Sequence, residues 1–225
     1  MGRRASKEAL AFYLGTANAD LYLCRWFNLY YGAVKGTAYK WLDLKTLFLR
    51  ILKPKHQILS IKYFTALVSG TDRDPQKPIR QKTYLRALQK YIPEIEIYYG
   101  HFLSNPIRAP LVTPTEGQHF ADVIKTEEKG SDVNLAVHLL NDAWLNSYDC
   151  AVIVSNDSDL AESMHLVKTQ HDKMLGLITP GKNRVTSRQL LNHASFARYI
   201  RDSALISSQL PDPIPGTRIH KPNTW

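Results

Sequence analysis

Cysteine is scarce in this chain of 225 residues, which has only Cys24 and Cys150. Two thiols cannot build the disulfide framework of a small secreted domain, so we expect buried thiols and a reducing, cytoplasmic location. No apolar run approaches the roughly 18 residues that a membrane span needs. Lys7 and Glu8 also interrupt the only stretch near the N-terminus with a signal-like composition. The sequence therefore predicts no membrane association.

Acidic residues are in the minority, with 20 Asp and Glu against 29 Lys and Arg, a formal net charge of +9. A positive excess of this size favours a polyanionic partner, above all nucleic acid, and argues against a cationic substrate. The apolar content of 44% is sufficient for one ordinary domain core.

Strand-like and helix-like segments alternate along most of the chain. Apolar patterning predicts strands at 21–24, 58–66, 95–99, 150–154 and 174–178, and helices at 41–52, 79–92 and 187–201. Residues 100–126 read as an insertion, such as an irregular hairpin, and the proline-rich end from 210 reads as an extended strap or a mobile tail. Alternating strands and helices predict a three-layer α/β domain with a mainly parallel central sheet.

Residues 129–160 carry the most informative pattern. A helix with apolar residues at helical spacing follows Gly130, and a short apolar strand from Cys150 to Val154 follows the helix. Asp132 lies at the start of this helix, while Asp157 and Asp159 come directly after the strand. Ligands gather at the carboxyl ends of strands in open α/β sheets, so these carboxylates are candidates to bind one hard cation such as Mg²⁺.

Each of these residues also has a purely structural interpretation. Asp157 and Asp159 are ordinary caps for the helix that follows, and Ser131 or Asp132 is a suitable cap for its own helix. Asp132 is also the kind of first-turn carboxylate that a helix dipole favours. Glu127 and Glu128 read as surface charges.

Three segments together resemble the NYN branch of the PIN-like nucleases: FNLYYG (27–32), EEKGSDVNLAVHLL (127–140) and SNDSDL (155–160). The resemblance implies a Rossmann-like (PIN-like) domain over about 27–203 that cleaves RNA with Mg²⁺ or Mn²⁺. It assigns metal binding to Asp132, Asp157 and Asp159, and orientation of the carboxylate cluster to Asn28. Residues 204–225 would form a proline-rich tail, and residues 1–26 an atypical N-terminal segment.

The chain departs from that family at its first motif, Asp-Gly-x-Asn. Asn28 matches, but Arg25 and Trp26 stand where the family has Asp and Gly. A cation in place of a metal-bound carboxylate removes a ligand and repels Mg²⁺. The sequence therefore predicts an impaired ribonuclease, with a catalytically inactive RNA-binding or scaffold module as the alternative. A hydrolase of small phosphoesters fits the carboxylates but not the excess positive charge.

A shifted reading frame is one explanation for Arg25 and Trp26. Cys-Arg-Trp-Phe can be encoded by TGT CGA TGG TTT, and reading from the second base gives Val-Asp-Gly. The same shift carried upstream permits RTYIYVDGFN, which resembles a first strand of the family. We hypothesise that residues 1 to about 26 are read out of frame.

Candidate RNA contacts are less specific. Lys129 beside Gly130, and Arg80 and Lys82 in a basic helix, are suitable for binding phosphates but equally for facing solvent. The eight histidines show no metal-binding spacing, and the oligomeric state stays open.

Overall fold

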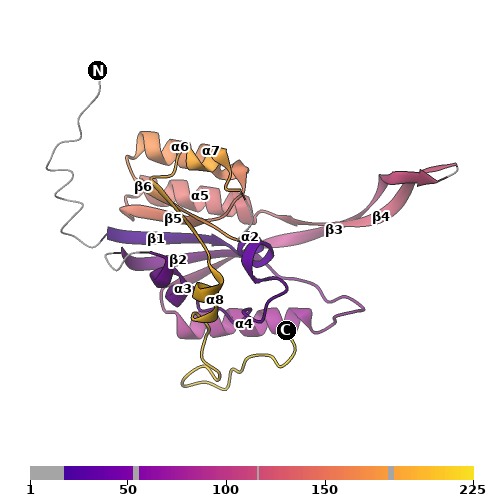
Figure 1. Ribbon diagram of the computed structural model, residues 1–225, viewed down its shortest axis with the longest axis horizontal. Coiled ribbons are helices and arrows are strands. Elements are labelled where there is room, and N and C mark those ends of the chain that lie inside the picture. Colours follow the sequence, from indigo (N-terminus) through magenta and orange to yellow (C-terminus); the bar gives the residue numbers. More distant parts are fainter. Residues whose placement is uncertain (1–17, 53–55, 116, 182–184) are drawn as a thin grey trace.

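A seven-stranded sheet in the order β4-β3-β2-β1-β5-β6-β7 forms the centre of the protein (Figure 1). The computed structural model describes residues 18–52, 56–115, 117–181 and 185–225, so the first seventeen residues of the atypical segment lie outside the described residues. Neighbouring strands run parallel except β3 and β4, which are antiparallel. The predicted α/β class with a mainly parallel sheet is confirmed. The strands are β1 (Asn18–Arg25), β2 (His56–Ala66), β3 (Ile95–Thr115), β4 (Gln118–Lys129), β5 (Cys150–Val154), β6 (Met174–Thr179) and β7 (Phe196–Tyr199).

Strand β1 lies in the middle of the sheet, between β2 and β5. Its residues Leu21 to Cys24 are buried, because helices cover both faces of a central parallel strand. Cys24 pairs with Val154 of β5, and Arg25 is the last residue of β1. Arg25 therefore lies at the carboxyl edge of the sheet, beside the end of β5.

Helices cover both faces of the sheet, which gives the predicted three layers (Figure 1). One core cluster packs α3 (Leu44–Ile51), α4 (Lys77–Tyr91) and α8 (Asp202–Ile206) against one face. The other core cluster packs α5 (Ser131–Trp144), α6 (Ala161–Gln170) and α7 (Arg188–Leu191) against the opposite face. Helix α3 begins three residues later than predicted, because the Asp43 carboxylate caps it by accepting from the backbone N–H of Thr46. The short elements are α2 (Trp26–Leu29), η1 (Tyr30–Val34) and the 3-10 helix η2 (Ser158–Leu160).

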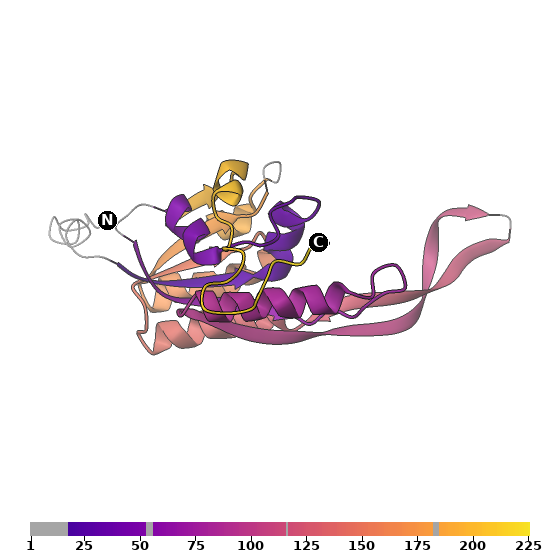
Figure 2. The same ribbon diagram turned by 90° about the horizontal axis from the view of Figure 1, so that it is seen from below.

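The predicted insertion after residue 100 is a hairpin, and its pairing is irregular between Pro110 and Thr115, where the register shifts. Strands β3 and β4 leave the body together as a long arm, paired from His101 and Lys129 outward to Thr115 and Gln118 (Figure 2). Gly117, at a φ of 76°, takes the left-handed conformation in the turn. Most side chains of the arm are exposed on both faces.

The segment 187–201 was wrongly predicted as one helix. Helix α7 ends at Leu191, and residues 196–199 pair with β6 as the edge strand β7. The change begins where the N–H of Ser195 donates to the carbonyl of Leu175, 2.7 Å away. Pairing with the open edge of β6 satisfies backbone groups over this stretch, and it outweighs a helical spacing of apolar residues.

The proline-rich end packs on the body as an extended strap. Leu210, Ile214 and Ile219 are buried in the first core cluster. The ring of Trp225 lies 5.8 Å from that of Trp41, so the last residue also contacts the core. Cys24 and Cys150 are free and buried as predicted, and burial raises the pKa of both thiols. In the described part of the chain, no helix has the length and apolar character needed to cross a membrane.

Candidate functional site

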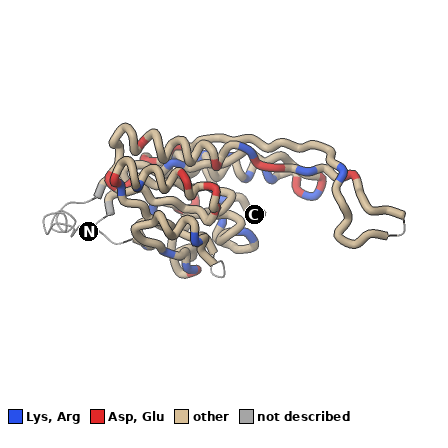
Figure 3. The backbone as a smooth tube through the Cα atoms, turned by 90° about the horizontal axis from the view of Figure 1, so that it is seen from above, with Lys and Arg blue, Asp and Glu red and all other residues tan. Residues whose placement is uncertain are grey.

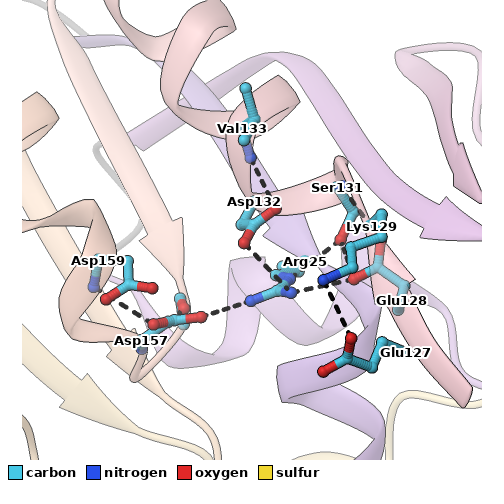
Figure 4. A network of polar contacts seen from close by, with 10 residues as sticks. Arg25, Glu127, Glu128, Lys129, Ser131, Asp132, Val133, Asp157 and Asp159 are labelled. Atoms are coloured by element: carbon cyan, nitrogen blue, oxygen red, sulfur yellow. Dashed lines mark hydrogen bonds and ion pairs between the residues drawn. The ribbon is translucent and has the colours of Figure 1, made fainter. Parts of the chain in front are cut away.

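Arg25 is the centre of a polar cluster at the carboxyl edge of the sheet (Figure 4). Its Nη1 donates to the Asp157 carboxylate in the loop after β5. Its Nη2 lies 3.0 Å from Oε2 of Glu128 near the end of β4, and its Nε lies 3.0 Å from Oγ of Ser131 at the start of α5. One guanidinium thus joins three elements that are more than one hundred residues away from it in the sequence.

These contacts are largely shielded from water. Arg25 is 8% exposed, and the Glu128 side chain is 5% exposed. A planar guanidinium suits this position because its five donors diverge toward several acceptors at once. Asp132 is more peripheral, with its Oδ2 at 3.8 Å from Nη2 of Arg25. Three carboxylates therefore surround a single positive group.

Asp157 and Asp159 have different roles despite their spacing. One Asp157 oxygen contacts Arg25, while the other accepts a hydrogen bond from the backbone N–H of Asp159 at 3.3 Å. Asp157 is thus the cap of η2, as the structural interpretation predicted. The Asp159 side chain is exposed and has no ion pair among the described residues.

Glu128 was wrongly predicted to be a surface charge. Its Oε1 accepts from the N–H of Ser131 at 3.1 Å, and its Oε2 accepts from the Ser131 hydroxyl at 2.7 Å. The Gly130 turn brings these groups together at a φ of 88°, so Gly130 rather than Ser131 or Asp132 precedes the first helical residue. A Cβ on Gly100 of β3 would come within 2.4 Å of the Lys129 carbonyl oxygen, so the close approach of β3 to the end of β4 also requires a glycine. In the sequence, the only signal for this buried acceptor is a glycine two residues after Glu128, which is weak, and it was missed.

Asn28 lies in α2, the short helix that begins directly after Arg25. Its Oδ1 is buried and has no hydrogen-bond partner among the described residues. A buried amide oxygen without a donor is uncommon, so this atom is available to a bound water or ligand.

The three residues predicted to contact RNA differ in their ion pairing. Nζ of Lys129 lies 3.1 Å from a Glu127 carboxylate oxygen, and Arg80 is paired with Asp74. Lys82 is exposed and has no ion pair within the described residues. Lys82 is therefore the one of the three without a carboxylate partner among the described residues, while Lys129 shares Glu127 with Lys125.

A divalent cation does not fit this cluster in the present chain. The Arg25 guanidinium lies between Asp157 and Glu128, which is where a cation shared by these carboxylates would have to bind. Within the described residues, no three His, Cys, Asp or Glu side chains are arranged to hold a metal ion. Asp132 and Asp157 both lie beside a guanidinium of the protein itself.

Comparison with known proteins agrees with this architecture. The family model of the NYN domain matches residues 28–201. The chain belongs to the NYN domain family. The resemblance of the three motifs to this family is therefore confirmed.

Two further proteins are similar to this NYN domain. The 6-hydroxy-3-succinoylpyridine 3-monooxygenase HspA of Pseudomonas putida (strain DSM 28022 / S16) is 33% identical over 226 residues, covering 88% of this chain and 72% of that protein. The crystal structure of VPA0982, a protein of unknown function from Vibrio parahaemolyticus RIMD 2210633, superposes with a TM-score of 0.53 at 16% identity. It covers 83% of this chain and 95% of that one, and at this identity it supports the fold alone.

Proposed function

We propose that this NYN domain, as its sequence stands, binds RNA without metal-dependent cleavage. The observation that carries the proposal is the Arg25 guanidinium among the carboxylates of Glu128, Asp132 and Asp157. It supplies the positive charge that Mg²⁺ or Mn²⁺ would otherwise bring, but it cannot activate water as a metal does. This is the inactive-module alternative from the sequence, now supported by geometry.

RNA is the proposed partner because of family membership and charge. The chain carries a net charge of +9. Its Lys and Arg residues are spread over several elements rather than confined to one (Figure 3). Such a distribution suits contacts with the phosphate backbone, which position a strand without reading its sequence. The outer part of the β3–β4 arm carries few charges, so we place the RNA on the body. The predicted cytoplasmic location is consistent with this role.

The active ribonuclease remains the proposal for a version with aspartate at position 25. That carboxylate would join Glu128, Asp132 and Asp157 at the same edge, and oxygen donors of this kind are those that Mg²⁺ and Mn²⁺ prefer. Asn28, with its buried unpaired Oδ1, would complete the polar lining. The metal, when bound, would supply Lewis-acid activation of water and charge stabilisation at the phosphate.

Two observations support the shifted reading frame as the origin of Arg25. The family match begins at residue 28, two residues after Trp26, so it leaves out the Arg25 and Trp26 positions. Strand β1 also buries the acidic Asp20, and the buried Tyr22 hydroxyl has no hydrogen-bond partner among the described residues. Polar groups of this kind are unusual in a central parallel strand. Resequencing the locus tests the idea, and codons whose shifted reading does not give Val-Asp-Gly would reject it.

A second candidate function comes from the relative in Pseudomonas putida. Its name describes a monooxygenase that acts on 6-hydroxy-3-succinoylpyridine, and 33% identity over 88% of this chain makes a related oxygenation a specific alternative. Such a reaction requires O₂ and a two-electron donor. Oxygen uptake with 6-hydroxy-3-succinoylpyridine and a reduced nicotinamide, above the uptake without the pyridine, would favour this candidate over RNA binding.

The deciding experiment compares three versions of the full chain on labelled single-stranded RNA with Mg²⁺ or Mn²⁺. We expect the present chain to bind RNA without cutting it, Arg25→Asp to cut it, and Arg25→Met to bind without cutting. Trp26 is kept in all versions because its ring lies 5.3–5.8 Å from those of Tyr30, Tyr63 and Tyr84, and Trp26→Gly would open a gap there. Metal-dependent cutting by the present chain, abolished by Asp157→Ala, would refute the proposal.

A further inference from the structure

A second polar site lies away from the Arg25 cluster, in a pocket of about 530 Å³ between α3, β7 and α8. Helix α8 packs beside α3 on one face of the sheet (Figure 1). Residues of the edge strand β7 line the same pocket. This volume is within the range of small-ligand sites. The pocket shares no residue with the cluster around Arg25, and it is lined by Arg50, Ile51, Ala197, Arg198, Tyr199, Arg201, Ser203, Ala204 and Ser207.

Three arginines from three elements line this pocket. Arg50 comes from the last turn of α3, Arg198 from β7, and Arg201 directly precedes α8. No ion pair joins any of the three to a carboxylate within the ranges that the structure describes. Arg198 is oriented by a hydrogen bond from Nη1 to the Ala197 carbonyl at 2.9 Å and by contact with the Phe196 ring at 5.7 Å. Like charges gathered in one pocket repel each other, and a bound anion removes that repulsion.

Hydroxyl groups complete the lining. The Tyr199 hydroxyl accepts from Oγ1 of Thr186 at 3.3 Å, which leaves its own O–H free to donate. Tyr199 is 54% exposed, so a planar group can stack on its ring. Ser203 adds a further donor at the same rim.

We propose that this pocket binds the phosphate group of a nucleotide. Guanidinium groups match phosphate oxygens with paired hydrogen bonds, and three of them exceed the charge of one phosphate monoester. The pocket volume accommodates a mononucleotide with its base beside Tyr199. The same chemistry also suits a phosphate of an RNA strand, so the source of the phosphate is decided by experiment.

The test is calorimetric titration of the full chain with AMP, adenosine, inorganic phosphate and a short oligouridylate. We expect AMP to bind and adenosine to bind far more weakly. The double variant Arg198→Gln/Arg201→Gln should lose at least about tenfold in affinity for AMP, because two charge-assisted hydrogen bonds are removed. Circular dichroism confirms that the variant is folded.

The matched control is Arg86→Gln/Arg188→Gln, which removes the same charge from two exposed arginines outside the pocket. It should change the AMP affinity less than about twofold if the pocket is specific, since Arg86 and Arg188 lie outside the pocket and act on the ligand only through long-range attraction, which physiological salt screens. Binding of the oligouridylate but not AMP, weakened only in the pocket variant, identifies RNA as the source of the phosphate. An equal loss in both variants, or no binding of any phosphate compound, overturns the proposal.

Discussion

Replacing Arg25 by aspartate gives the sharpest test of the idea that this side chain stands in for a metal ion. The Arg25 pairs with Glu128 and Asp157 are mostly buried, and removing one partner of a buried pair costs about 3–5 kcal/mol. Arg25→Asp adds a further negative charge, so we expect a loss near the upper end of that range without metal. A divalent cation should then recover part of the loss.

The recovery can be given a magnitude. A cation present at one hundred times its Kd stabilises the folded state by about 2.7 kcal/mol. For a domain of this size, that corresponds to a rise of roughly 5–10 °C in Tm. Thermal unfolding followed by circular dichroism, in EDTA and in Mg²⁺ or Mn²⁺, measures it. The present chain should show no comparable shift.

Arg25→Met is the control, since it frees the carboxylates without adding another one. Its metal-dependent rise should be smaller than that of Arg25→Asp, because one oxygen ligand is missing. If Mg²⁺ stabilised the present chain as much as the aspartate variant, the cation would not compete with Arg25. If Arg25→Asp gained nothing from metal, the carboxylates would not form a metal site even when unblocked. Either result would refute the reasoning.

Three further predictions concern stability. Asp142→Ala should lower the free energy of unfolding by about 3–5 kcal/mol in urea titrations. It removes the carboxylate 2.6 Å from the buried Lys62 ammonium and leaves that charge without an ion-pair partner. A loss below about 1 kcal/mol would contradict this prediction. Gly130→Ala should lower the free energy of unfolding by about 1–2 kcal/mol in the same assay, because the φ of 88° at this position strains any residue with a Cβ. An unchanged unfolding midpoint would show that the turn rearranges. Burial, and to a lesser extent the Lys62 charge, lower the pKa of His138 in the folded protein. Below about pH 6.5 the unfolded chain therefore binds more protons than the folded one, and stability should fall as the pH drops through that value. His138→Gln should flatten this pH dependence, and an unchanged profile would assign it to other groups.

The sequence was sufficient to predict most of the fold. Apolar patterning located β1, β2, β5 and β6 and the order of helices between them, because period-two and period-3.6 patterns report directly on buried faces. It failed at 187–201, where the open edge of β6 drew residues 196–199 into the sheet. A helical period within one segment contains no information about a vacant strand edge elsewhere.

The candidate site was likewise predictable from the sequence only in part. Sequence alone identified Asp132, Asp157 and the departure at Arg25, because these depend on residue type and on local order along the chain. Only the tertiary structure brought Glu128 into the cluster and showed what occupies its centre. The guanidinium meets its acceptors only after β1, β5 and the start of α5 have packed at one edge of the sheet. Burial at that edge lowers the local dielectric, so charge pairs that would attract only weakly at the surface form a strongly coupled ionic cluster.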